Sequence, residues 1–216
     1  MKRLKANIIS VNIGTPMKLV GLGKAVTSSL EKNPVEDEIY LTKLNLEGDK
    51  QADLDNHGGE DKALCVYPFD YYPYWEEKAG QRLRLGAFGE NLTVKGLVEE
   101  AVCIGDVFQW GEAQVQVSQP RIPCYKVAMR FGMKELPNEI IKTGYTGFYM
   151  RVIKEGNVSA DTPLQFVKRY SDVSVSLVNE IYYSDSYNKE AINQIINVKE
   201  LAYVWRDQMK KKLEEM

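Results

Sequence analysis

Alternating apolar and polar residues predict short strands along most of the chain. The alternation is clearest near the middle, where Val115 and Val117 alternate with Gln114 and Gln116, because successive side chains of a strand point to opposite faces of its sheet. The dipeptide at 111–112, just before this run, fits the two-residue turn of a β-hairpin. We expect strands at 6–14, 38–46, around 64–66, 101–104, 106–110, 113–118 and 148–152.

Helical spacing of apolar residues interrupts these strands at three places. An aromatic segment at 67–80 predicts a short helix, and a second helix is expected to begin close to Cys124. A third helix is expected between Pro137 and Gly144, since proline suits the first turn of a helix and glycine its end.

The last fifty residues are helical in pattern. Asp172, Asn188 and Asn197 are candidate N-caps of three helices, and Asn197 with Glu200 resembles a capping box. We therefore expect a mainly β, barrel-like domain with short helices over residues 1–168, followed by a small three-helix domain over residues 169–216.

Composition limits the classes of function. The 216 residues are 44% hydrophobic and 27% charged, and the formal net charge is −2, as in an ordinary globular protein. This charge gives no electrostatic reason to expect nucleic-acid binding, and no stretch approaches the roughly 20 apolar residues of a membrane span. The basic N-terminus is not followed by the apolar segment of a secretion signal. We expect a cytoplasmic protein that binds neither nucleic acid nor membrane.

The three cysteines are too widely spaced for a disulfide framework or a zinc site. Cys65 and Cys103 lie in apolar runs, and we interpret them as core residues. Cys124 differs, because it follows a loop stiffened by Pro120 and Pro123 and precedes a helix.

The surroundings of Cys124 favour a thiolate. Unpaired N–H groups at a helix start and the cations of Arg121 and Lys126 all stabilise negative charge on sulfur. Cys124 therefore suits a nucleophile or a ligand of a soft metal. The alternative is a small buried residue in a strand-to-helix turn.

Two polar loops that contain glycine run into predicted strands. His57, the one histidine of the chain, precedes the glycines at 58–59, which let a ligand approach the backbone, and Asp61 and Lys62 add an acceptor and a cation. The second loop ends at Asn91, which suits either contact with a heterocycle or a hydrogen bond within the loop. For the first loop, the alternative is that the two glycines only allow a tight turn.

Three segments together resemble one family. They are His-Gly-Gly-Glu-Asp-Lys-Ala at 57–63, Phe-Gly-Glu-Asn-Leu at 88–92 and Ser-Gln-Pro-Arg-Ile-Pro-Cys-Tyr-Lys at 118–126. The chain resembles MOSC-domain proteins, named for the C-terminal part of molybdenum-cofactor sulfurases. Within them it is similar to the bacterial branch linked to 6-hydroxylaminopurine resistance, which carries a C-terminal three-helix domain. The resemblance covers nearly the whole chain.

The resemblance implies a MOSC-type β-barrel that binds the molybdenum cofactor or its metal-free pterin, molybdopterin. Cys124 would be the catalytic residue and the protein's sulfur ligand to molybdenum, a role that suits a soft thiolate. Thr27 stands where the family often has arginine, so one anion contact is missing or comes from elsewhere. The cofactor-binding residues implied by the resemblance are Lys32, His57, Asp61, Lys62, Asn91, Arg121 and Lys126.

The resemblance implies a molybdenum-dependent reductase of N-hydroxylated compounds, such as N-hydroxylated purine bases. Three scattered cysteines cannot hold a four-thiolate iron–sulfur cluster, so the electrons are expected from a separate reductase protein. Pyridoxal phosphate is not expected. Two alternatives remain: a molybdopterin carrier without turnover, and a hydrolase or transferase with Cys124 as nucleophile and His57 as base. The aromatic run at 71–75 is compatible with a homodimer interface or with burial in the monomer.

Overall fold

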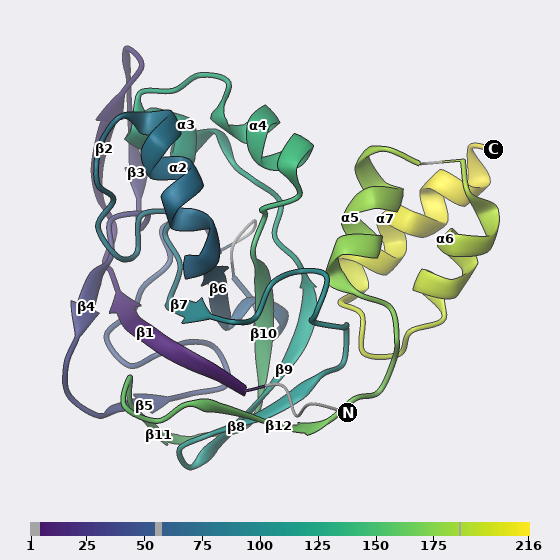
Figure 1. Cartoon of the computed structure of the whole chain (residues 1–216), viewed down its shortest axis with the longest axis horizontal. Coiled ribbons are helices and arrows are strands. Elements are labelled where there is room, and N and C mark those ends of the chain that lie inside the picture. The colour runs from purple at the N-terminus through teal and green to yellow at the C-terminus, as the bar shows by residue number, and fades with distance from the viewer. Residues whose placement is uncertain (1–4, 55–57, 186) are drawn as a thin grey trace.

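The computed structural model describes residues 5–54, 58–185 and 187–216 and shows a β-barrel beside a small helical domain (Figure 1). The strands are β1 (Lys5–Ile13), β2 (Met17–Gly21), β3 (Lys24–Ser28), β4 (Asn33–Val35), β5 (Ile39–Leu41), β6 (Leu64–Pro68), β7 (Leu92–Lys95), β8 (Val107–Trp110), β9 (Ala113–Pro120), β10 (Phe148–Lys154), β11 (Gly156–Val158) and β12 (Leu164–Lys168). The helices are η1 (Glu60–Lys62), η2 (Phe69–Tyr71), α2 (Tyr72–Ala79), α3 (Tyr125–Phe131), α4 (Leu136–Thr143), α5 (Val175–Tyr183), α6 (Lys189–Ile196) and α7 (Tyr203–Glu214).

Seven strands in the described part of the chain close into a barrel. Their order is β12-β8-β9-β10-β6-β7-β1, and β1 pairs back to β12. β6 and β7 run parallel, whereas the other neighbours in the ring are antiparallel. β4 pairs with the second half of β1. Closure satisfies the strand edges that an open sheet would leave unpaired, which confirms the expected mainly β, barrel-like fold.

Burial in β9 includes its apolar positions and also Gln116, which is 8% exposed, so the strand is covered on both faces. Val115 and Val117 of β9 are fully buried, and the hairpin turn at 111–112 joins β8 to β9 as predicted. The buried apolar cluster continues from the barrel into the helical domain, where it includes Val175 and Trp205. The two parts of the chain therefore share a continuous apolar contact.

A second apolar cluster covers one end of the barrel. It joins Tyr72 and Trp75 of α2 to Tyr67 and Phe88, and buried residues of η2, α3 and α4 complete it. Tyr67 and Phe88 stack with ring centroids 4.1 Å apart. Burial within one chain thus accounts for much of the aromatic run at 71–75, and the homodimer stays a prediction. Across the described residues, no helix combines the length and apolar character needed to cross a membrane.

Two predicted strands differ in the structure. Residues 101–104 form a turn with an isolated bridge from Cys103 to Ser174, because their backbone bonds with the segment leading into α5. The strand expected at 38–46 is limited to β5, since the Thr42 side chain bonds with the backbone of Asn45 and closes a turn.

The helix starts of the C-terminal domain were predicted correctly in one case of three. Asn188 caps α6, and its side chain accepts from the backbone N–H of Ala191. Asp172 is not a cap: the bridge at Ser174 keeps the chain extended, and Ser174 itself caps α5. Asn197 ends α6 rather than starting α7, because Ala202 first bonds with a strand of the barrel.

Candidate functional site

Cys124 lies at the junction of β9 and α3. β9 ends at Pro120, the backbone N–H of Arg121 donates to the carbonyl of Gly147 at 3.1 Å, and the chain then passes Pro123. Cys124 has extended dihedral angles (φ −105°, ψ 156°) and is the N-cap residue of α3. The predicted helix start is confirmed, and the half-buried thiol is held by a stiff loop at the barrel rim.

Cys124 lines two adjoining cavities. The inner cavity has a volume of about 80 Å³ and lies against the loop at 88–91 and the loop around residue 30. The outer groove has a volume of about 410 Å³ and extends to α7. Shared lining residues make the two continuous: Asp53, Lys62, Ile122, Cys124, Lys126 and Tyr149.

Arg121 puts a fixed positive charge on the wall of the inner cavity. Its side chain is 5% exposed, and Nη2 donates to the Phe88 carbonyl at 2.6 Å. Burial lowers its pKa, but attraction to Cys65, Tyr149 and Cys124 outweighs burial and raises the pKa above the usual value. The guanidinium therefore stays charged beside both thiols.

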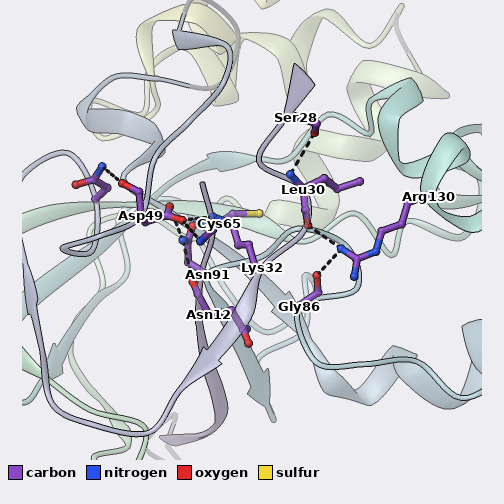
Figure 2. Close-up of polar contacts among 11 residues, drawn as sticks. Asn12, Ser28, Leu30, Lys32, Asp49, Cys65, Gly86, Asn91 and Arg130 are labelled. Atoms are coloured by element: carbon purple, nitrogen blue, oxygen red, sulfur yellow. Dashed lines mark hydrogen bonds and ion pairs between the residues drawn. The ribbon is translucent and has the colours of Figure 1, made fainter. Parts of the chain in front are cut away.

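A buried polar network forms another wall of the inner cavity (Figure 2). Asp49 accepts from Lys32 Nζ at 2.5 Å, from Asn91 Nδ2 at 2.9 Å and from the Gly14 N–H at 2.8 Å. Asn91 Oδ1 accepts from the Cys65 N–H at 3.1 Å. Lys32 and Asn91 thus both line the cavity, with the ammonium and both ends of the amide already bonded within the protein.

Two lysines line both cavities. Lys62 follows the histidine loop, and burial lowers its pKa against the opposing effect of Asp61 and Asp53. Lys126 lies in the first turn of α3, and its Nζ is 3.9 Å from Asp53 Oδ2. With Arg121 these lysines make the space around Cys124 electropositive.

The histidine loop contributes to the cavities only in part. Asp61 lines neither cavity, because Arg151 Nε binds its carboxylate at 2.7 Å and Ser118 Oγ donates to its backbone carbonyl at 2.6 Å. His57 lies outside the described residues. The structure thus brings Lys62 to the site and places Asp61 in an ion pair beside it.

Some lining residues were not found from the sequence. Cys65 is buried, as predicted for a core residue, yet it also lines the inner cavity. Burial raises its pKa to about 11, while Arg121 lowers it. Asp49 was not among the predicted site residues, and Tyr149 was predicted only within the strand at 148–152. No local pattern in the sequence identifies Asp49 and Tyr149 as site residues, because contacts between distant segments of the folded chain bring them to the cavity.

The outer groove has a wall from the helical domain. Val204 and Gln208 of α7 line it together with Gln119 of β9. Among the described residues, no group of three or more histidine, cysteine or carboxylate side chains lies close enough to hold a metal ion. Cys124 is thus the more exposed of the two thiols that line the inner cavity, in an electropositive setting.

Comparisons with known proteins agree with this architecture. A family model described as the MOSC domain matches residues 53–165, and one described as a YiiM-like 3-alpha helix domain matches residues 173–215. The chain is 48% identical over 217 residues to YflK of Bacillus subtilis, covering 100% of this chain and 98% of that protein. It is 41% identical over 188 residues to YiiM of Escherichia coli, covering 86% and 84%.

A longer fungal protein and a solved structure are also similar. A protein of Gibberella moniliformis named as a reductase is 33% identical over 157 residues, which cover 71% of this chain and 28% of that protein. The crystal structure of YiiM from Geobacillus stearothermophilus has a TM-score of 0.83 and 39% identity, covering 96% of this chain and 99% of that one. The chain therefore belongs to the MOSC-domain family, in the group whose barrel is followed by a YiiM-like three-helix domain.

Proposed function

We propose that this protein is a molybdenum-cofactor-dependent reductase of N-hydroxylated compounds. The observation that carries the proposal is the Cys124 thiol, which lies where the inner cavity meets the outer groove. The outer groove, with its volume of about 410 Å³, is the part with room for a cofactor, and the inner cavity of about 80 Å³ adjoins it at Cys124, so a cofactor and a substrate that share this space would meet at the same sulfur atom.

The residues fit a molybdenum cofactor better than a bare metal ion. A bare ion needs several protein ligands, whereas the cofactor brings its own dithiolene sulfurs and needs one further soft donor. Cys124 would supply that donor. The cofactor also carries a phosphate, and Arg121, Lys62 and Lys126 supply positive charge around the cavity. Lys32 lines the same cavity, with its ammonium bound to Asp49.

When bound, the cofactor supplies the two-electron chemistry that converts an N–OH group into N–H and water with two protons. The protein's own part is to hold and orient the cofactor and the substrate. Cys124 is held by the N-cap backbone of α3, and Arg121 is fixed by its bond to the Phe88 carbonyl. The lowered pKa of Lys62 makes its ammonium a better proton donor in the space shared by both cavities.

The electrons are proposed to come from a separate protein. The three cysteines of the chain are fewer than the four that an iron–sulfur cluster requires. The similar fungal protein is named as a reductase, and the segment similar to this chain makes up 28% of it. That proportion supports an arrangement in which a MOSC-type unit works with redox parts outside it.

The test is the formation of adenine from 6-hydroxylaminopurine. Protein made in a host that synthesises the cofactor is supplied with a chemically reduced viologen as electron donor, and adenine is quantified by chromatography. We expect adenine from the wild type and background levels from Cys124→Ser, with the surface variant Lys211→Ala as the control. Wild-type protein that carries molybdenum and pterin but forms no adenine would favour a carrier and contradict the proposal.

A further inference from the structure

The loop that leads to Cys124 is held at its start by one backbone carbonyl. The Gly147 carbonyl accepts from the Arg121 N–H at 3.1 Å and from the Thr146 hydroxyl at 2.9 Å. Gly147 has a φ of 73°, and a Cβ there would lie 2.5 Å from the Val66 carbonyl oxygen. Both the dihedral angle and the close approach therefore require glycine where the chain presents this carbonyl to the loop.

A chain of hydrogen bonds connects this carbonyl to the helical domain. Asn179 of α5 donates through Nδ2 to the Thr146 hydroxyl at 2.8 Å, and that hydroxyl donates in turn to the Gly147 carbonyl. Asn179 is 5% exposed and Thr146 is fully buried, a setting in which consecutive hydrogen bonds strengthen one another. A side chain of the three-helix domain thus helps to fix the carbonyl that holds the Arg121 N–H.

Glu99 gives the same glycine a second connection to α5. Its carboxylate accepts from the Gly147 N–H at 2.6 Å, and its backbone carbonyl accepts from the Ser176 N–H at 3.1 Å, in the first turn of α5. The N–H and the carbonyl of Gly147 are therefore both bonded to residues that α5 contacts. The helical domain and the start of the Cys124 loop meet at this one glycine.

Packing alone does not account for an asparagine at position 179. The buried face of α5 is otherwise apolar, with Val175, Val178 and Ile181. Asn179 Oδ1 is buried without a hydrogen bond from any described residue. An unpaired buried acceptor is destabilising, whereas an apolar side chain of similar size would leave none. A local choice made against stability is expected at functional positions, which indicates that Asn179 is present for the donor that it offers to Thr146.

We infer that Asn179 and Thr146 are positioning residues for the loop at 121–124, and that the three-helix domain thereby helps to set the position of the Cys124 thiol. The inference rests on the proposed function for the part that Cys124 plays in the reaction. Neither residue lines either of the two cavities, so each acts through the Gly147 carbonyl and the Arg121 N–H rather than on a ligand.

The test measures hydrogen exchange at the Arg121 amide of the full chain by NMR spectroscopy. Thr146→Val and Asn179→Leu keep the approximate side-chain volume and remove the donor. Each is expected to speed this exchange about tenfold, the factor that corresponds to one hydrogen bond. Thr146→Ser keeps the hydroxyl and should exchange as the wild type does. Asn193→Leu, at an exposed position of α6, is the matched control and should also leave the exchange unchanged.

An internal reference and a rate measurement distinguish positioning from a general structural role. The Val117 N–H of β9, which donates to the Asp106 carbonyl at 2.9 Å, reports opening of the sheet. General destabilisation would speed exchange at Val117 and Arg121 alike, whereas positioning predicts a change confined to Arg121. The rate of adenine formation per bound molybdenum is expected to fall in Thr146→Val and to stay at the wild-type level in Thr146→Ser.

The outcomes separate this inference from the proposed function. Unchanged exchange at Arg121 in both Thr146→Val and Asn179→Leu, or equal acceleration at Arg121 and Val117, would overturn the positioning role. If the wild type forms adenine and neither variant loses rate per bound molybdenum, the reductase stands and the positioning role falls. If exchange changes as expected but the wild type forms no adenine, the loop support stands and the proposed function falls.

Discussion

Replacing Glu99 with glutamine should remove a pH dependence of stability. Glu99 is buried where the barrel meets the helical domain, and its carboxylate accepts from the Tyr71 hydroxyl and from the Gly147 N–H, both at 2.6 Å. Burial raises its pKa from 4.5 to about 7, although these two hydrogen bonds lower it. The folded protein therefore retains a proton on Glu99 that the unfolded chain releases.

The sign and size follow from this difference. Between pH 4.5 and 7 the folded state binds more protons, so the free energy of unfolding falls as the pH rises and then levels off. At about 1.4 kcal/mol per pKa unit, the full change is about 3 kcal/mol. That is a large fraction of the roughly 5–15 kcal/mol by which a domain is stable. Glutamine is neutral throughout, so Glu99→Gln should lack this contribution.

Urea unfolding at several pH values between 4.5 and 8 measures the effect. The quantity is the difference in unfolding free energy between wild type and variant, so that other titrating groups cancel. We expect Glu99→Gln to gain about 3 kcal/mol relative to wild type over this range. Glu77→Gln, at an exposed position, is the control and should follow the wild type. Parallel curves for wild type and Glu99→Gln would refute the reasoning.

Three further predictions concern the site and its supports. Asp49→Asn should lower the unfolding free energy by about 3–5 kcal/mol in urea, because it leaves Lys32 buried and unpaired; Lys32→Met combined with it should restore part of the loss, and additive effects would contradict the pairing. Arg151→Met should speed amide exchange at 200–204, since a bond to that segment is lost; unchanged exchange by mass spectrometry would contradict it. Iodoacetamide at pH 8 should modify Cys124 before Cys65, whose pKa burial raises to about 11, and peptide mapping that finds Cys65 first would count against the assigned burial.

Local signals in the sequence were enough for several elements. Pro123 and the helical spacing after it located the start of α3, and the side chain of Asn188 caps α6 as expected. The alternation at 113–118 predicted the strand β9. Each of these depends on neighbours within a few residues, so it can be read from the order of residues alone.

Contacts between distant segments account for what was missed. Asp172 has the chemistry of an N-cap, but the bridge between Cys103 and Ser174 moves the helix start to Val175. The same holds for the site: Asp49 is held at the inner cavity by bonds from Gly14, Lys32 and Asn91, which are distant in the sequence. Nothing within the chain's local pattern shows such pairings.

The site residues implied by the family resemblance differ in whether they line the inner cavity. Six of them, including Lys62 and Arg121, line the inner cavity, whereas Asp61 is bound by Arg151 beside it. Gln208 was not identified as a groove residue, because the contacts that dock its helix onto the barrel are made by Arg151 and Ala202. No local pattern around Gln208 indicates these contacts. The sequence motifs thus identify residues around Cys124, whereas the wall of the outer groove formed by α7 depends on how the two domains pack.

The most direct test of the account is metal and pterin content of protein purified from a host that makes the cofactor. Molybdenum is measured by mass spectrometry and pterin by fluorescence, for wild type, Cys124→Ser and Cys103→Ser, whose buried cysteine lies outside both described cavities. We predict molybdenum and pterin in the wild type and in Cys103→Ser, and loss of molybdenum in Cys124→Ser. Wild-type protein without either, or Cys124→Ser with full molybdenum, would contradict the assignment of Cys124 as the ligand.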